Sequence, residues 1–164
     1  MRERSNSSPG RPPLTQLGAK SVLTDAQLEE PRSILEAFPN PRPQRDYQVQ
    51  FVFPEFTSVC PVTGQPDFAT ITVRYVPDRQ CVEMKSLKLY FFAYRNKGIF
   101  YEAVVNTILD DLVAALSPRR MTVVGQFAVR GGTAGTVTAE HDASCDGRDA
   151  RNGHAGRGRK RPSR

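Results

Sequence analysis

The chain has 164 residues, of which 38% are hydrophobic, and its formal net charge is +6 at pH 7. This length suits one domain with its own core and is short for two. We find no signal peptide in the sequence and no apolar run long enough to cross a membrane, which argues against a secreted or membrane protein. The only histidines, His141 and His154, lie near the C-terminus, which argues against a metallo-hydrolase. We therefore expect a cytoplasmic protein that requires no metal.

Residues 1–33 are rich in Ser, Pro and Gly, with one helix-like patch at residues 25–29. We interpret this segment as a poorly ordered N-terminal arm, because such a composition buries too little apolar surface to offset the entropy of ordering it. The predicted domain spans residues 34–139 and begins near Ile34.

Two segments alternate apolar and polar side chains at the period of a half-buried strand, residues 47–53 and residues 68–76. The connection between these two strands contains Cys60. A third, short strand is predicted at residues 81–84, after a turn at residues 77–78.

Two helices are predicted next. Apolar side chains follow helical spacing over residues 87–94, where Ser86 can cap the helix, although the aromatic content of this segment leaves a strand as the alternative. A second helical stripe covers residues 105–116, and Pro118 ends it. A last strand at residues 121–129 leads into a turn at residues 130–132. This order of elements is typical of an α+β fold with an antiparallel sheet.

The basic character of the chain is concentrated outside the predicted domain. Residues 47–139 carry nine basic and seven acidic side chains, whereas residues 140–164 carry seven basic and four acidic ones. We interpret residues 140–164 as a disordered basic tail and its run at residues 157–161 as solvated charge, so that no direct contact with nucleic acid is required. An RNA-binding tail is the alternative.

Cys60 and Asp67 are the candidate catalytic pair. Cys60 lies among turn-forming residues, whereas a cysteine used for packing more often lies in an apolar run. Direct proton transfer from a thiol to an aspartate of ordinary pKa costs about 6 kcal/mol, so a working pair requires a desolvated pocket that raises the pKa of the acid towards neutrality. Such a pair suits addition of sulfur to a C≡N or C=N carbon with protonation of the nitrogen. A structural turn cysteine and a capping aspartate are the alternative.

Three blocks carry a resemblance to a known family: residues 56–61 (FTSVCP), residues 64–70 (GQPDFAT) and residues 82–90 (VEMKSLKLY). They closely resemble the short form of the NADPH-dependent 7-cyano-7-deazaguanine reductases, the nitrile reductases of queuosine biosynthesis in tRNA modification. The similarity runs from about Leu35 to Gly132.

The resemblance implies a tunnelling fold, in which small subunits with an antiparallel sheet and two helices on one face assemble into rings. Stacked rings, expected here as a decameric homo-oligomer, place the active sites between neighbouring subunits. The resemblance further implies that Cys60 attacks the nitrile carbon to form a covalent thioimide and that Asp67 supplies and recovers protons. NADPH acts as co-substrate, two molecules per turnover, and the product is 7-aminomethyl-7-deazaguanine.

Contacts with the substrate and the cofactor are also implied by the resemblance. Glu102 matches the glutamate that accepts hydrogen bonds from the guanine-like edge of the base, a role that suits a carboxylate facing two adjacent N–H donors. Further substrate contacts are implied for four residues, Val82, Glu83, Met84 and Tyr101. Contacts with the cofactor phosphates are implied for Lys85 and Lys88. Taken alone, Glu102 also fits a first-turn helix carboxylate, and the two lysines fit a solvated helix face.

Tyr101 departs from the family pattern, because the family usually has histidine at this position. A group that titrates near neutrality is thereby replaced by a phenol with an ordinary pKa of about 10. We expect activity to survive this change. Two other functions stay open at this point: a diverged purine- or pterin-binding protein of the tunnelling fold, and an RNA-binding module.

Overall fold

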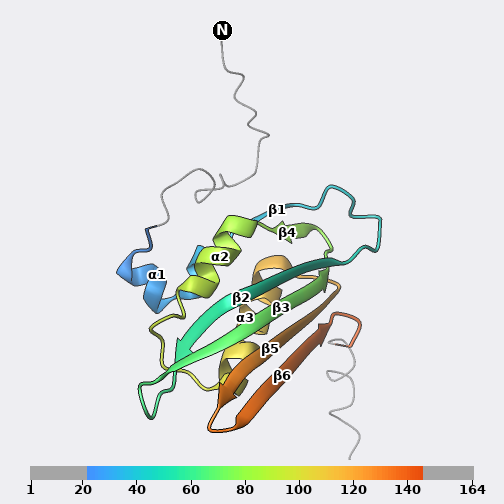
Figure 1. Cartoon of the computed structure of the whole chain (residues 1–164). Helices are drawn as coiled ribbons and strands as arrows, with labels where there is room; N and C mark the ends of the chain where they lie inside the picture. Colours follow the sequence, from blue (N-terminus) through green and yellow to red (C-terminus); the bar gives the residue numbers. More distant parts are fainter. Residues whose placement is uncertain (1–21, 146–164) are drawn as a thin grey trace, which may run out of the picture.

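The structure is a computed structural model that describes residues 22–145. It contains both helices and strands (Figure 1). The helical elements are α1 (Asp25–Glu29), the 3-10 turn η1 (Pro31–Ile34), α2 (Met84–Phe92) and α3 (Tyr101–Leu116). The strands are β1 (Ala37–Pro39), β2 (Val49–Val59), β3 (Pro66–Val76), β4 (Gln80–Val82), β5 (Arg120–Arg130) and β6 (Thr133–Asp142).

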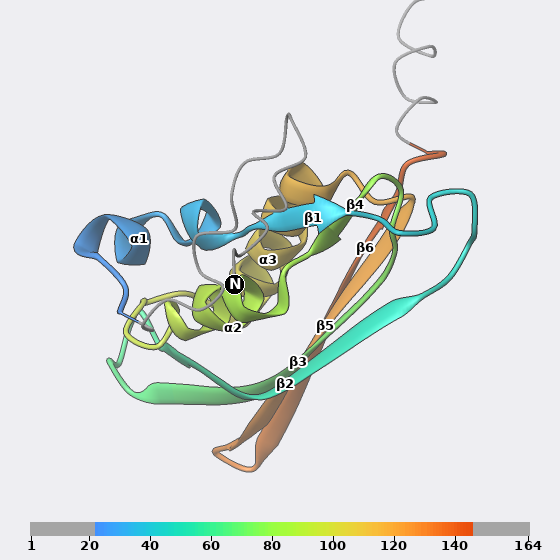
Figure 2. The same cartoon turned by 90° about the horizontal axis from the view of Figure 1, so that it is seen from above.

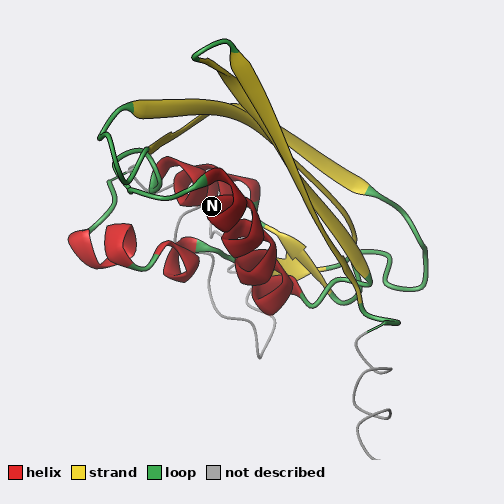
Figure 3. Cartoon of the chain, turned by 90° about the horizontal axis from the view of Figure 1, so that it is seen from below, coloured by secondary structure: helices red, strands yellow, loops and turns green. Residues whose placement is uncertain are grey.

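The main sheet is antiparallel, with its four strands in the order β2-β3-β5-β6, and β1 pairs with β4 in a separate small ladder. The main sheet curves, and α2 and α3 both lie on its concave face, as Figures 2 and 3 show from opposite sides. This is the α+β architecture expected for one tunnelling-fold subunit, an antiparallel sheet with two helices on one face. The assembly of such subunits into rings stays a prediction.

The core lies between the concave face of the sheet and the two helices. Along β3 the inward side chains are buried and most of the alternate ones are partly or fully exposed, which is the period-two pattern that predicted this strand. On α3 the apolar stripe is buried as its helical spacing predicted: Val105, Ile108, Leu109, Leu112 and Leu116. Each such side chain contributes about 1.5–3 kcal/mol when it is fully buried, so this contact holds α3 against the sheet.

Gly125 allows α3 to approach the middle of β5 closely. A Cβ atom at this position would lie 2.6 Å from Cγ2 of Val105 and 3.0 Å from the ring of Phe127. Contacts this short require the helix or the ring to move. The absence of a side chain at Gly125 therefore sets how closely the first turns of α3, which contain Tyr101 and Glu102, lie against the sheet.

Several element boundaries differ from the sequence prediction. The sequence indicated no strand after the turn at residues 130–132, but Gly131 and Gly132, with φ of 59° and 80°, turn the chain into β6, which pairs with β5. β6 also continues past residue 139 to Asp142, while residues 1–21 and 146–164 of the predicted arm and tail lie outside the described residues. The short strand β1 was not predicted either. The segment predicted at residues 87–94 is helical as far as Phe92, within α2, so the strand alternative is wrong.

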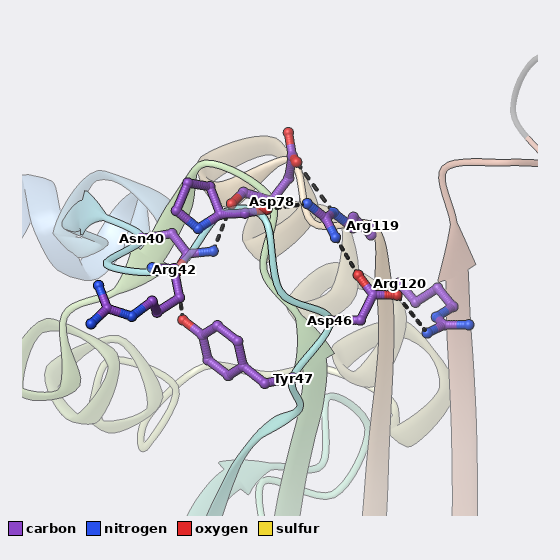
Figure 4. Close-up of polar contacts among 8 residues, drawn as sticks. Asn40, Arg42, Asp46, Tyr47, Asp78, Arg119 and Arg120 are labelled. Carbon is purple, nitrogen blue, oxygen red and sulfur yellow. Dashed lines mark hydrogen bonds and ion pairs between the residues drawn. The ribbon is translucent and has the colours of Figure 1, made fainter.

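Polar contacts join three segments at the end of the sheet remote from the β2–β3 turn (Figure 4). Arg119, just before β5, forms ion pairs with Asp46 and with Asp78, the latter at 3.3 Å. The side-chain amide of Asn40 donates to the backbone carbonyl of Asp78 at 2.7 Å and accepts from the Tyr47 hydroxyl at 2.6 Å. These contacts fix the loop at residues 40–47 against β5 and the β3–β4 turn.

Candidate active site

Cys60 occupies the turn that joins β2 to β3. Its N–H donates to the carbonyl of Gln65 at 2.8 Å, and the N–H of Gly64 donates to the carbonyl of Cys60 at 2.9 Å. These two hydrogen bonds close the turn on either side of the thiol. The side chain is 7% exposed, so the sulfur lies below the surface of the turn.

The turn is also attached to the connection between α2 and α3. The N–H of Val59 donates to the carbonyl of Lys97, and the N–H of Ile99 donates to the carbonyl of Val59, both at 3.0 Å. Together they form a parallel bridge between Val59 and Gly98. The backbone that carries Cys60 is therefore held from the strand side and from the helix side.

A pocket of about 390 Å³ opens beside the thiol. It is formed by the β2–β3 turn, the start of α3 and the β5–β6 hairpin. Its lining residues are Cys60, Pro61, Asp67, Phe100, Tyr101, Glu102, Arg130, Thr133 and Gly135. The structure thus brings together four residues that the sequence predicted for one site, which are Cys60, Asp67, Tyr101 and Glu102.

The Asp67 carboxyl group is held by two donors at a single oxygen. The phenol of Tyr101 donates to Oδ1 at 2.9 Å, and Nη1 of Arg130 donates to the same Oδ1 at 2.6 Å. The side chain is 4% exposed, whereas that of Arg130 is 44% exposed. Oδ2 makes no hydrogen bond to any residue from 22 to 145. This oxygen is the one left for proton exchange with a ligand.

The environment of the Cys60 sulfur favours the thiolate. A hydrogen bond from the Thr63 hydroxyl, the backbone N–H groups of Thr63 and Val62 and the guanidinium of Arg130 lower the pKa of the Cys60 thiol to about 6, against the opposing effect of burial. Backbone N–H groups that converge on one anion form a nest, and the adjacent cation adds to the same effect. A thiol with such a pKa is mostly ionised at neutral pH and is an activated nucleophile.

Tyr101 is fixed by its ring and by its hydroxyl. The ring stacks on that of Phe127 with centroids 3.7 Å apart and planes 9° apart. Burial and the hydrogen bond to Asp67 raise the pKa of the Tyr101 phenol above its ordinary value. The phenol therefore stays protonated near neutral pH and acts as a hydrogen-bond donor, which is a different role from that of a titrating histidine.

Glu102 lies in the first turn of α3, where the sequence predicted a carboxylate that suits the helix dipole. Its side chain is exposed, and the carboxylate makes no hydrogen bond or ion pair with the described part of the chain. The carboxylate lines the same pocket as Cys60 and is open to N–H donors of a ligand.

Arg130 is the site residue that the sequence did not reveal. It was assigned to a turn, but it ends β5, and the β5–β6 hairpin directs its guanidinium towards Asp67, which lies 63 positions earlier in the chain. The only local signal is the following pair of glycines, which marks a tight hairpin and so fixes where the arginine stands. No spacing rule connects it with Cys60.

The other predicted site residues lie away from the Cys60 pocket. Val82 is buried at the end of β4, and the carboxylate of Glu83 caps α2 by accepting from the backbone N–H groups of Lys85 at 2.9 Å and Ser86 at 2.7 Å. The predicted cap, Ser86, was therefore wrong. Its hydroxyl instead donates to the carbonyl of Glu83 at 2.8 Å.

Met84 and Lys88 line a second, apolar pocket of about 270 Å³ between β2 and α2. Met84 is 57% exposed, and Lys85 and Lys88 lie three positions apart on the first turns of α2. A single chain thus presents the Cys60 pocket and the predicted cofactor lysines on separate surfaces. Their proposed roles stay predictions.

Residues 22–145 lack two features. No group of three or more His, Cys, Asp or Glu side chains in this range is placed to hold a metal ion. None of the helices in this range has both the length and the apolar character needed to span a bilayer.

Comparison with known proteins gives consistent results. A family model described as QueF-like protein matches residues 66–146. An NADPH-dependent 7-cyano-7-deazaguanine reductase of Thermomicrobium roseum is 58% identical over 118 residues, which cover 72% of this chain and 92% of the reductase. A reductase of the same name from Chlorobium phaeovibrioides is 62% identical over 112 residues, which cover 68% of this chain and 97% of the reductase. The chain belongs to this reductase family.

A solved structure supports the relationship at the level of the fold. The crystal structure of the archaeosine synthase QueF-Like in the apo form is similar with a TM-score of 0.54 and 25% sequence identity, over 57% of this chain and 91% of that chain. Because the two curated reductases are matched over almost their full length, membership of the 7-cyano-7-deazaguanine reductase family rests on much more than the motif around Cys60.

Proposed function

We propose that this chain reduces the nitrile of 7-cyano-7-deazaguanine to the aminomethyl group with NADPH, through a covalent thioimide on Cys60. The observation that carries the proposal is the position of Cys60 and Asp67 in one pocket, with a thiol pKa that its surroundings lower, in a chain that belongs to the 7-cyano-7-deazaguanine reductase family. An activated thiolate is the group that addition to a nitrile carbon requires.

The first step forms a bond between the Cys60 sulfur and the nitrile carbon. One of the C≡N bonds opens, and the nitrogen takes up one proton to give the neutral thioimide. The turn that holds Cys60 fixes the sulfur in advance, which reduces the entropy lost when substrate and nucleophile meet. No core histidine is needed, because the thiol is ionised without one.

Oδ2 of Asp67 exchanges the proton with the substrate nitrogen in this proposal. Tyr101 and Arg130 both donate to Oδ1, so they fix the carboxyl group while leaving Oδ2 open to the pocket. A carboxyl oxygen held within hydrogen-bond reach of the reacting nitrogen is the geometry that general acid catalysis needs. Tyr101 then positions Asp67 and does not itself titrate.

NADPH, when bound, supplies two hydrides per catalytic cycle, which reduce the nitrile carbon by four electrons in total. Lys85 and Lys88 are the residues of this chain suited to its phosphates. They lie on adjacent turns of α2, and the side chain of Lys88 is exposed. Ammonium groups at this spacing present two positive charges to one side of the helix.

Glu102 recognises the guanine-like edge of the substrate in this proposal. Its open carboxylate offers two acceptor oxygens to the two adjacent N–H groups of that edge. Because Glu102 and Cys60 line the same pocket, one ligand can contact both of them.

The complete site is assembled between neighbouring subunits of a cytoplasmic ring-shaped homo-oligomer in this proposal. Its support is the separation within one chain of the Cys60 pocket from the pocket that contains Met84 and Lys88. Contact between subunits is the simplest way to bring the two surfaces to one substrate. The oligomer is also favoured by exposed apolar side chains on the sheet and its turns, namely Val52, Val62, Phe68 and Val129.

A mass spectrum of the intact protein tests the proposal directly. The wild type is mixed with 7-cyano-7-deazaguanine in the absence of NADPH, alongside Cys60→Ala and, as a matched control, Cys81→Ala. We expect an adduct of one substrate mass on the wild type and on Cys81→Ala but not on Cys60→Ala. NADPH should discharge the adduct and release the amine. An adduct on Cys60→Ala, or neither adduct nor NADPH oxidation by the wild type, would refute the proposed function.

A further inference from the structure

Ser58 carries a buried hydroxyl for which the fold provides no partner. The residue is 0% exposed, and its Oγ is the one fully buried side-chain oxygen or nitrogen within residues 22–145 that makes no hydrogen bond. Burial of a hydroxyl without a hydrogen bond destabilises a protein relative to an apolar residue of similar size. Groups that lower the stability of the fold are concentrated at active sites, where they have a role in function.

The strand register places Ser58 beside Asp67. The two residues are directly opposite each other in the β2–β3 ladder, and both are buried on the concave side of the sheet. Side chains in directly opposite positions have Cβ atoms about 4.5–5.5 Å apart. The hydroxyl of Ser58 is therefore a neighbour of the Asp67 carboxyl group, approached from the side of β2.

The hydrogen bonds of Asp67 leave a role for such a neighbour. Tyr101 and Arg130 both donate to Oδ1, and no described residue donates to Oδ2. Oδ2 is the oxygen that exchanges a proton in the proposed reaction, so its charge changes during each cycle. A charge that appears in a buried place is stabilised most by a donor that is already there.

We infer that Ser58 is a positioning residue whose hydroxyl donates a hydrogen bond to Oδ2 of Asp67 once that oxygen has lost its proton. This inference rests on the proposed function. In the free chain the Ser58 hydroxyl makes no hydrogen bond. With substrate bound, when Asp67 has given its proton to the substrate nitrogen, the hydroxyl turns to donate to the carboxylate, because a hydroxyl rotates freely about its bond. This hydrogen bond is released when Asp67 regains the proton. The serine keeps its own proton throughout.

Cys60 is a second polar side chain close to Ser58 in the sequence, and it is the weaker candidate. Cys60 lies two residues after Ser58, which at the rise of a strand separates the two Cα atoms by about 6–7 Å. The sulfur also has its own donors, which are Thr63, Val62 and Arg130. The Asp67 carboxyl group is both the closer neighbour by register and the one with an oxygen that lacks a donor.

Ser58→Ala separates this role from a structural one. We expect its melting temperature to equal or exceed that of the wild type, while kcat falls at least about tenfold and the acidic limb of the kcat–pH profile shifts. Titration of the Cys60 thiolate by ultraviolet absorbance should not change. Ser58→Thr, which keeps the hydroxyl, should recover most of the lost activity. Ser86→Ala is the matched control: its buried hydroxyl is hydrogen bonded to Glu83 and Glu36, so its melting temperature should fall.

Three results would overturn the inference. The first is a Ser58→Ala enzyme with the kcat and pH profile of the wild type. The second is a raised thiolate pKa in that variant, which would assign the hydroxyl to Cys60 instead. The third is a lower melting temperature or failure to fold, which would show that the hydroxyl has a partner in the folded chain. A wild type that forms no adduct removes the proposed function and this inference together, whereas equal turnover of wild type and Ser58→Ala removes the inference alone.

Discussion

Replacing Thr63 by valine tests how the turn activates its cysteine. The Thr63 hydroxyl makes the largest contribution to the low pKa of the Cys60 thiol, which is about 6. At pH 7 such a thiol is about nine-tenths ionised, compared with roughly one part in thirty for a cysteine with the ordinary pKa of about 8.5. Valine keeps the β-branched shape at an exposed position and removes the donor, together with a long hydrogen bond of 3.4 Å that the Thr63 hydroxyl accepts from the Gln65 N–H.

We expect Thr63→Val to raise the pKa of the Cys60 thiol by about one pH unit, because a hydrogen bond to a charged acceptor has roughly that effect. At pH 7 the ionised fraction then falls to about one half. The backbone N–H groups of Val62 and residue 63, together with Arg130, should hold the pKa of the variant below the ordinary value.

The assay is the rate of alkylation by iodoacetamide as a function of pH, measured by mass on the peptide that contains Cys60, because Cys145 is also exposed. Thr57→Val is the matched control, since Thr57 lies on the adjoining strand β2 with its side chain on the face opposite to that of the buried Ser58. An unchanged midpoint in Thr63→Val, or an equal shift in Thr57→Val, would refute this account of the activation.

The same pKa has a consequence for stability. The folded chain holds the thiol proton less tightly than the unfolded chain does. This group therefore adds stability that is fully present above the ordinary thiol pKa and is lost as the pH falls through about 6. In Thr63→Val the loss should be smaller and should be complete at a higher pH, because only the folded-state pKa is raised. Urea unfolding of both proteins across this range measures the difference.

Three further predictions concern the helices and the site. Tyr101→Phe removes the donor to Asp67 but keeps the ring, so we expect kcat, measured by NADPH oxidation, to fall about tenfold while the adduct still forms. An inactive wild type whose activity is restored by Tyr101→His would contradict the positioning role of Tyr101. Gly125→Ala should lower the free energy of unfolding by about 1–3 kcal/mol in urea because of its short contacts, whereas Gly135→Ala, whose Cβ would lie 3.6 Å from Tyr101, should have little effect. Burial raises the pKa of Asp111 despite its hydrogen bond from Tyr90, so the free energy of unfolding should fall as the pH rises above about 4. Asp111→Asn should make this dependence on pH weaker. An equal dependence in the two proteins would contradict the role given to Asp111.

Much of the fold follows from local patterns in the sequence. Period-two alternation located β2 and β3, and helical spacing located α3, because in each case one face is buried against the same core. β6 was missed because its side chains are small or polar and most of them are not buried, so the pairing with β5 defines it and its own composition does not. Glu83 was missed as a cap because serine is the more usual capping residue, whereas here a glutamate reaches two N–H groups.

The candidate site was predictable only in part. Cys60 and Asp67 come together through one hairpin, so their spacing contained the information. Arg130 reaches them only through the pairing of β3 with β5, a long-range contact that no sequence spacing indicates. From the sequence we predicted that the thiol and the acid share one proton. In the structure, a guanidinium and a phenol donate to the acid, and N–H groups donate to the sulfur.

Because Val59 and Gly98 form a bridge, the number of residues in the connection from α2 to α3 is constrained. By its composition, with Asn96, Lys97 and Gly98, this loop resembles the places where insertions are usually tolerated. Its backbone, however, forms a two-hydrogen-bond bridge with the residue just before Cys60. One added residue here would shift that bridge and move the sulfur, while the buried face of α3 stayed packed. Libraries built on this chain should therefore vary the identity of residues 95–99 and keep their number.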